Sequence, residues 1–365
     1  MSYEWTLFRY IFARCLRSVA FVFAAFFALV VLVDIIELLR SLASRDGVGF
    51  SDVLIMSFLR GPNLAEQLLP FSLLFGALWA FAQLNRHAEI VVMRSSGLSA
   101  WRIVAPAVAA AIAIGLGAVF IINPISSKMM AKAEEIRTRM TEGERSLITV
   151  SPTGGLWLRQ AEADRQYVIH AAAIAEAGER FERVAVWAFD NDQRFEERYD
   201  APSALIVDGA LKLQAPLVAR AGRPIERAEE LSIPTPFTKE RIQESAADPN
   251  ALSIWELPAF IRLARAAGLS SARYQLQQHK LMALPFELAA MVLIAAAFSL
   301  RPMRSGGAVR LIIFGVVAGF AVYILADVAN EIGRSGRAPA MLAAWTPALA
   351  GALFAITAIL HFEDG

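Results

Sequence analysis

The sequence offers little that performs covalent chemistry. Its four histidines, His87, His170, His279 and His361, lack the spacing of metal ligands, and a single cysteine, Cys15, excludes an internal disulfide. The sequence has no phosphate-binding loop, no GxSxG nucleophile elbow and no HExxH zinc motif. We therefore expect no catalytic residue, no metal site and no bound cofactor in this chain. ATP-driven work would require ATP and Mg²⁺ on a separate ATPase subunit.

The stretch with the clearest potential for binding is residues 83–102, QLNRHAEIVVMRSSGLSAWR. Its centre predicts a short helix with an apolar body, which Gly97 ends before Ser99 caps the next helix. Two interpretations fit such an apolar link between membrane spans. Either the helix lies in the lipid headgroup layer, or it docks into a groove on a soluble partner while Glu89 and Arg94 fix its orientation.

Charged residues near the ends of apolar runs form a second group of candidates. Two pairs of acids share a helical face, Asp34 with Glu37 and Asp327 with Glu331. These acids either pair with Arg40 or Arg334 across a gate between the first and fifth spans, or reach interfacial water. A set of cations near the outer ends of the first three spans either binds lipid phosphates or anchors helix ends. The set comprises Arg40, Arg45, Arg60, Lys128, Lys132, Arg137 and Arg139.

Composition indicates which elements position these residues. The chain has 365 residues, of which 56% are hydrophobic and 19% charged, and this composition is too apolar for an ordinary soluble domain. A membrane-spanning helix needs about 20 mostly apolar residues. Six runs have this length, near residues 18–40, 63–84, 101–123, 279–300, 308–330 and 341–361. Residues 53–59 predict a separate interfacial helix that ends at the break Gly61-Pro62.

The arginines of the short connections predict the orientation. They form three groups on one side of the membrane, which are Arg9, Arg14 and Arg17, then Arg86, Arg94 and Arg102, then Arg301, Arg304 and Arg310. Since short cytoplasmic connections carry an excess of Lys and Arg, we expect both termini in the cytoplasm. Residues 125–278 then lie on the opposite side of the membrane.

Between the third and fourth spans the pattern changes to short alternating runs separated by turn residues. These runs predict antiparallel strands near residues 156–158, 167–169, 184–189, 204–207 and 211–213. Roughly 100 residues of this kind suit a β-sandwich or jelly roll. The expected fold is therefore a polytopic α-helical membrane protein with an inserted β-jellyroll domain. Its parts are three helices in 1–124, the β domain in 125–278, and three helices in 279–365.

Several motifs resemble those of the LptF/LptG lipopolysaccharide export permease family. In and after the second span these are Leu69-Pro70-Phe71, Leu74-Phe75-Gly76-Ala77-Leu78, Leu84-Asn85-Arg86 and the segment from Glu89 to Gly97. Further along they are Gly154-Gly155-Leu156-Trp157, Tyr274-Gln275-Leu276, Pro302-Met303-Arg304 and the segment from Gly315 to Asp327. The resemblance covers essentially the whole chain and is closest to the LptG branch.

The resemblance implies a half-transporter in the bacterial inner membrane with a periplasmic β domain. Its implied partners are an LptF-like permease subunit, an LptB-like ATPase dimer, an LptC-like single-span protein and an LptA-like bridge. Lipopolysaccharide would be extracted through a cavity lined by the first, second and fifth spans. Residues 86–97 would form the coupling helix that meets the ATPase. Its candidate contact residues are Arg86, Glu89, Val92, Met93, Arg94 and Gly97.

One feature departs from the family pattern, and other functions compete. Some LptG proteins carry a lysine within the first span, where this chain has Val30-Val31-Leu32-Val33-Asp34.

The rival assignment within the family is the LptF type, which shares the architecture. Outside the family, a secondary transporter would show broken spans and ionisable residues at mid-membrane. A membrane scaffold without transport activity would explain the β domain but not the coupling helix. No feature indicates a nucleic-acid partner.

Overall fold

The structure is a computed structural model that describes residues 2–42, 49–142, 146–150, 156–162, 165–175, 180–190, 194–207, 209–220, 222–235, 248–266, 270–300 and 308–363. The chain divides into two compact units. One unit combines Met1–Met130 with Gln275–Gly365 and is called the membrane unit below, and the other is Ala131–Tyr274, called the β unit.

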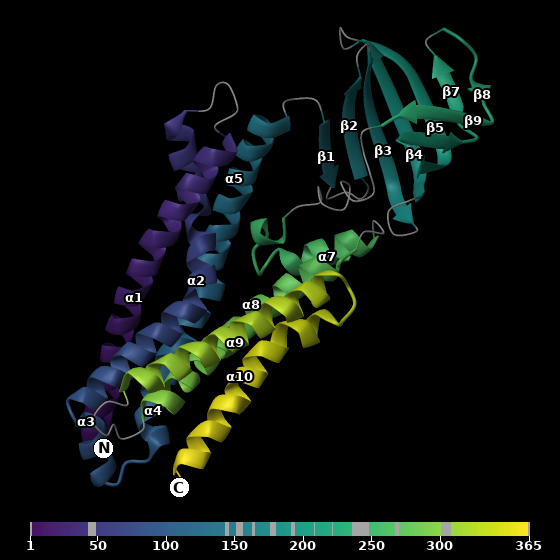
Figure 1. Cartoon of the computed structure of the whole chain (residues 1–365). Helices are drawn as coiled ribbons and strands as arrows, with labels where there is room; N and C mark the ends of the chain where they lie inside the picture. The colour runs from purple at the N-terminus through teal and green to yellow at the C-terminus, as the bar shows by residue number, and fades with distance from the viewer. Residues whose placement is uncertain are drawn as a thin grey trace. The chain divides into compact units, whose positions relative to one another are not determined.

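The membrane unit is built from long helices (Figure 1). They are α1 Ser2–Leu42, α2 Phe50–Arg86, α4 Ala100–Gly117, the start of α5 Asn123–Glu142, most of α8 Ala272–Ser299, α9 Ala308–Arg334 and α10 Ala340–Glu363. A π-helical turn, Ala118–Ile122, joins α4 to α5 just before Pro124, whose missing N–H disturbs the regular pattern. Six helices in the described part are long and apolar enough to cross a membrane, which confirms the six expected spans.

The expected break at Gly61-Pro62 is wrong. The second long helix is continuous from Phe50 to Arg86 and contains Pro62 and Pro70 in its interior. Asp52 starts the helix by accepting a hydrogen bond from the Gly49 amide at 2.9 Å. Gly61 then packs beside the Phe27 ring of α1, so packing continues past the proline and compensates for one lost backbone hydrogen bond. No separate interfacial helix forms over residues 53–59.

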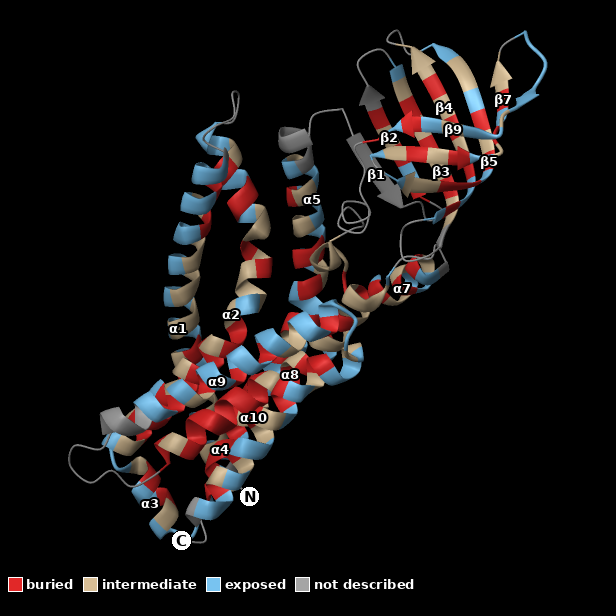
Figure 2. Ribbon diagram, turned by 45° about the vertical axis from the view of Figure 1, so that its right-hand side comes forward, coloured by how far each residue is buried: buried red, intermediate tan, exposed pale blue. Residues whose placement is uncertain are grey.

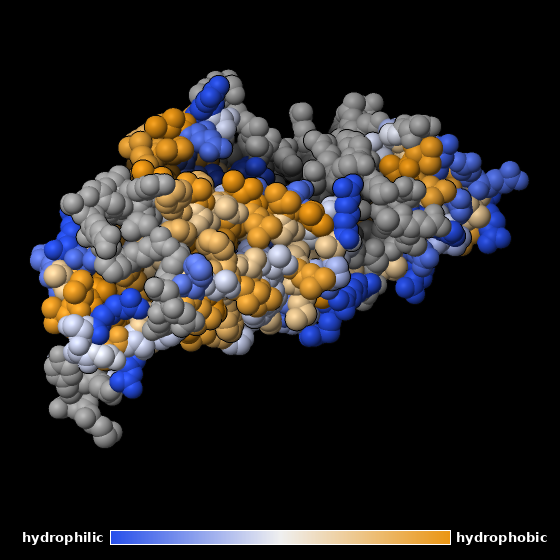
Figure 3. All heavy atoms as spheres, turned by 60° about the horizontal axis from the view of Figure 1, so that its bottom comes forward, coloured by the Kyte–Doolittle hydropathy of each residue, from blue (hydrophilic) through white to orange (hydrophobic). Residues whose placement is uncertain are grey.

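Burial is uneven among the helices of the membrane unit. Buried residues concentrate in α2, α4 and α8, whereas α1 and α9 consist mostly of exposed and intermediate residues (Figure 2). The exposed residues of α1 and α9 include large apolar side chains such as Phe21, Leu29, Val317 and Ile324. Apolar side chains form a broad surface over the long helices (Figure 3). This surface suits contact with lipid chains or with another apolar helix, because exposing apolar side chains to water is unfavourable.

In its described residues the β unit forms a nine-stranded antiparallel sheet, so the expected inserted β domain between the third and fourth spans is confirmed. Its strands are β1 Ser146–Val150, β2 Leu156–Glu162, β3 Arg165–Ala175, β4 Arg180–Asp190, β5 Phe195–Val207, β6 Ala210–Gln214, β7 Leu217–Arg220, β8 Glu226–Arg227 and β9 Glu230–Pro234. Strands β1 to β6 pair in chain order, β9 joins β6, and β7 pairs with both β5 and β8. Helix α7, Leu257–Ala266, completes the unit.

Successive residues of each strand point to opposite faces of the sheet, and one of these faces is buried while the other is partly exposed. Leu158, Ile169 and Val186 are buried in register, and the α7 residue Ala264 joins the same apolar cluster. On the opposite face, the Trp157 ring lies 4.4 Å from His170 and stacks on Trp187 at 5.7 Å between ring centroids. This period-2 pattern is the one that made the strands recognisable in the sequence.

A polar cluster joins β5 to β7. Tyr199 donates a hydrogen bond to Glu197, and the Arg220 Nε donates to the same carboxylate at 2.8 Å. Burial opposes ionisation of Glu197, but the hydrogen bonds from Tyr199 and Arg220 outweigh it and hold the pKa of this carboxyl below its ordinary value. Burial and the bond to Glu197 raise the pKa of Tyr199. At neutral pH the cluster is therefore an ionised carboxylate held by two donors, which fastens β7 to β5.

The close approach of α1 and α2 gives a test of the fold. A Cβ atom at Gly76 would lie 2.5 Å from the Val19 Cα atom and 2.9 Å from its backbone nitrogen, and backbone atoms cannot turn aside. We expect Gly76→Ala to destabilise the protein by about 1–3 kcal/mol, the usual cost of overpacking a core. The control is Gly117→Ala, because nothing lies within 4 Å of a Cβ atom at that glycine. Thermal unfolding in detergent measures both variants, and equal stability of the two would contradict this packing.

Candidate functional site

The link between α2 and α4 forms a short helix, α3 Glu89–Ser95. Its start is a turn in which Ala88 adopts a left-handed conformation with φ of 57°. Its end is a Schellman motif, because the Gly97 amide donates to the Arg94 carbonyl and the Leu98 amide donates to the Met93 carbonyl. Gly97 has φ of +85°, which a glycine adopts without strain, and Ser99 caps α4 by accepting from the Arg102 amide. The expected stop and cap are confirmed.

Helix α3 has an inner and an outer face. Ile90 and Met93 are buried in the main apolar cluster of the membrane unit, together with Leu84 and Ile103 of the neighbouring helices. The outer face carries Val91, which is 50% exposed, and Val92, which is 64% exposed. An apolar outer face on a helix anchored from beneath is a surface suited to a partner or to the lipid interface.

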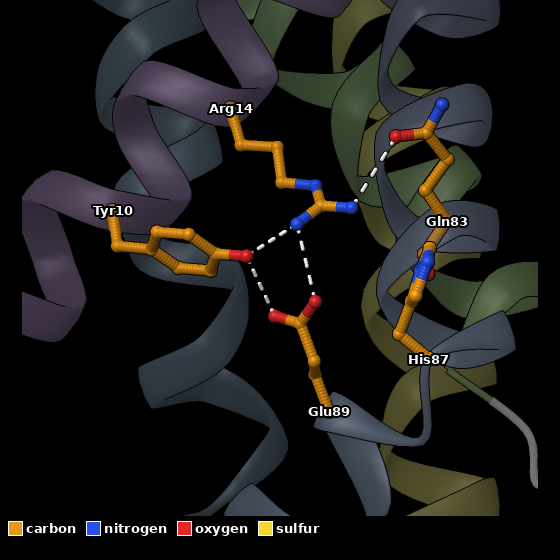
Figure 4. A network of polar contacts seen from close by, with 5 residues as sticks. All are labelled: Tyr10, Arg14, Gln83, His87 and Glu89. Carbon is orange, nitrogen blue, oxygen red and sulfur yellow. Dashed lines mark hydrogen bonds and ion pairs between the residues drawn. The ribbon is translucent and has the colours of Figure 1, made fainter.

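A polar network holds the first residue of α3 (Figure 4). The Tyr10 hydroxyl of α1 donates to Glu89 Oε2 at 2.8 Å, and the Arg14 guanidinium donates to Glu89 Oε1 at 3.1 Å. Arg14 also donates to the Tyr10 hydroxyl and, through its other terminal nitrogen, to Gln83 Oε1 at 3.3 Å. The His87 ring contacts the Gln83 carbonyl at 2.8 Å beside the network. One guanidinium therefore connects α1, α2 and α3.

The candidate coupling residues differ in their exposure and in their contacts. Arg86, Val92 and Gly97 are exposed, and Arg94 is half-buried. Met93 lies on the inner face, so its contacts are with the core. Glu89 is paired with Arg14, with 29% and 20% of their side-chain surfaces exposed. Sequence reasoning missed Tyr10 and Gln83 and used Arg14 only to orient the chain, although Tyr10 and Arg14 stand four apart, on one helical face.

The acids of the expected gate differ from one another in their surroundings. Asp34 pairs with Arg60 of α2 at 3.0 Å, and its side chain is only 4% exposed. Asp34 thus pairs with Arg60 rather than with Arg40 or Arg334, the two partners that the sequence suggested for these acids. Glu331 lies 3.9 Å from Arg334 on its own helix, and the structure shows Glu37 and Asp327 as exposed.

The candidate cations at the outer helix ends also differ in their partners and exposure. Arg60 is engaged by Asp34, as described above. Lys132 pairs with Glu135 at 2.8 Å, and Arg137 forms hydrogen bonds of 2.8–3.1 Å with Glu134. Arg40 and Lys128 are exposed, without an acidic partner among the described residues. Arg45 lies outside the described residues, and the side chain of Arg139 is likewise outside them.

Among the described residues, six helices suited to cross a membrane, an inserted antiparallel β unit and a short two-faced helix after the second span describe a polytopic membrane protein. Comparison with known proteins identifies the family. Residues 9–361 match the family model described as lipopolysaccharide export system permease LptF/LptG. The chain belongs to the LptF/LptG family and is therefore a lipopolysaccharide export permease subunit.

Two similar relatives are both named lipopolysaccharide export system permease protein LptG. The protein from Escherichia coli strain K12 is 24% identical over 330 residues, which cover 88% of this chain and 89% of the relative. The protein from Haemophilus influenzae is 23% identical over 354 residues, which cover 94% of this chain and 95% of the relative. The resemblance seen in the sequence motifs is thereby confirmed.

Proposed function

We propose that this chain is the LptG-like half of an exporter in the bacterial inner membrane. It pairs with an LptF-like subunit, is driven by an LptB-like ATPase dimer that binds ATP and Mg²⁺, and moves lipopolysaccharide out of the outer leaflet. Its β unit then passes the lipid toward an LptC-like protein and an LptA-like bridge. Two features support the LptG-like assignment: the name of the relatives, and the fact that they match over most of their length.

The observation that carries this proposal is the two-faced geometry of α3. Ile90 and Met93 fix the helix to the core of the membrane unit, while Val91 and Val92 stay exposed beside the half-buried Arg94. An apolar pair next to a charge suits a groove on a folded partner, where the charge sets orientation and the apolar pair contributes affinity. An element anchored in this way transmits force to α2 and α4.

The proposed orientation puts α3 and both termini in the cytoplasm and the β unit in the periplasm. Contacts within the membrane unit support a common end for these elements. Arg14 near the start of α1 reaches Glu89, and Asn85 at the end of α2 donates to the Ser299 carbonyl at the end of α8 at 3.0 Å. Arg86, Arg94 and Arg102 cluster at this end, as the excess of basic residues in cytoplasmic connections requires.

The same proposal accounts for the apolar surfaces of α1 and α9. Their large exposed side chains suit the LptF-like partner and the acyl chains of the lipid, which need an apolar cavity open to the bilayer. The phosphates of lipopolysaccharide need cations at the outer rim of that cavity. Arg40 and Lys128 are the candidates with exposed side chains, while Asp34 already neutralises Arg60. The acids Glu37, Asp327 and Glu331 would border the gate.

The docking role of α3 is tested by Val92→Asp. A charge on the exposed outer face should prevent entry into an apolar groove, so we expect recovery of the ATPase with the purified permease to fall sharply while membrane insertion is kept. The matched control is Val207→Asp, the same substitution at a 37% exposed residue of β5. Equal ATPase recovery from wild type and both variants would mean that α3 only lies on the bilayer.

The phosphate role of the cations is tested by the double variant Arg40→Gln with Lys128→Gln. Loss of charge-assisted contacts should lower the preference for phosphorylated over dephosphorylated lipopolysaccharide by about tenfold. The matched control is Lys132→Gln with Arg137→Gln, which removes the same charge from cations already paired with Glu135 and Glu134. An unchanged preference in the first variant, or an equal loss in both, would show that Arg40 and Lys128 are not the phosphate site.

A further inference from the structure

The carboxylate of Glu89 is engaged within the chain rather than free on the surface of α3. Tyr10 and Arg14 of α1 occupy both of its oxygens, at 2.8 Å and 3.1 Å (Figure 4). We propose that Arg14, supported by Tyr10, is a positioning residue that makes α1 move together with the coupling helix. This inference rests on the proposed function, because it concerns how movement of α3 by an ATPase reaches the first span.

The apolar anchor of α3 explains why a separate connection to α1 matters. Ile90 and Met93 pack among residues of α2 and α4, so movement of α3 is passed directly to those two helices. Helix α1 contributes Ile11 and Cys15 to the same cluster, but apolar contacts of this kind slide more readily than hydrogen bonds of fixed direction. The Arg14 guanidinium adds such direction, because it binds Glu89 and Gln83 at once.

The surroundings of the Arg14–Glu89 ion pair make this bridge stronger than a typical surface ion pair. The Arg14 and Glu89 side chains are 20% and 29% exposed, and the Tyr10 hydroxyl bonds to both. Partly buried, charge-assisted hydrogen bonds exceed exposed ion pairs in strength, because water and salt screen them less. Glu89 also begins α3, where a negative charge complements the partial positive charge of the helix terminus. Loss of Arg14 would therefore weaken the tie between α1 and α3, while Ile90 and Met93 still anchor α3 to the core.

The connection through Arg14 matters because of what lies on the outer part of α1. The helix runs without interruption from Ser2 to Leu42, and its outer part holds Asp34, which pairs with Arg60 of α2. The intervening surface is rich in exposed apolar side chains, including Phe21, Leu29 and Leu32. A pull applied through Arg14 at the cytoplasmic end is therefore transmitted along α1 to this lipid-facing surface. In this way ATP hydrolysis on one side of the membrane is coupled to a site for acyl chains.

The test uses the exporter assembled with its ATPase and compares three variants with wild type. Arg14→Gln removes the bridge, Arg14→Lys keeps the charge, and Tyr10→Phe removes one hydroxyl. We expect Arg14→Gln to retain ATPase recovery and ATP hydrolysis but to release about fivefold less lipopolysaccharide per ATP, the lower range of a coupling free energy. Arg14→Lys should recover most of this loss, and Tyr10→Phe should show an intermediate one.

The matched control is Arg17→Gln, which removes the same charge one turn away. Among the described residues, Arg17 donates only to the Ala13 carbonyl of its own helix, and its loss should leave lipid release per ATP unchanged. An Arg14→Gln exporter that releases as much lipid per ATP as wild type would overturn the inference, as would an equal loss in Arg17→Gln. If Arg14→Gln fails to assemble, a wild-type ratio in Tyr10→Phe overturns it. A wild-type chain that recovers no ATPase would instead reject the proposed function.

Discussion

The attachment of α3 to the membrane unit is the constraint on which the proposed function depends. A helix of seven residues is too short to be stable by itself, so its shape comes from its anchors. Ile90 and Met93 hold it from beneath, the Schellman motif at Gly97 ends it, and Arg14 holds Glu89 at its start. Under the proposed function, force from a partner ATPase enters through this firmly held element.

Two polar pairs in the membrane unit show how polar groups in the spans can compensate one another. Asp34 is buried beside Arg60, and the amide of Asn85 satisfies the Ser299 carbonyl at the end of α8. Such groups are costly in an apolar environment unless they are paired. The pairs therefore mark where helices must stay in register. The exposed Arg40 and Lys128 stand apart from this pattern, which is why they are the stronger candidates for an anionic ligand.

Local patterns in the sequence predicted the elements well, and contacts between elements poorly. Span length, strand alternation, the stop at Gly97 and the cap at Ser99 all depend on neighbouring residues. The continuity of α2 through Pro62 depends on packing against α1, and the partner of Asp34 depends on which faces of α1 and α2 meet. Arg14 and Glu89 are 75 residues apart, and no periodicity in one sequence reports such a pairing.

The central claim, that α1 and α3 move as one body, is tested most directly by replacing the polar bridge with a covalent one. In a variant with Tyr10→Cys and Glu89→Cys, a cleavable thiol cross-linker would join the two helices, while the native Cys15 is buried and protected. The account predicts that the cross-linked exporter releases more lipopolysaccharide per ATP than the same protein after cleavage of the linker. Loss of transport on cross-linking, with recovery after cleavage, would contradict it, because the two helices would then have to separate in each cycle.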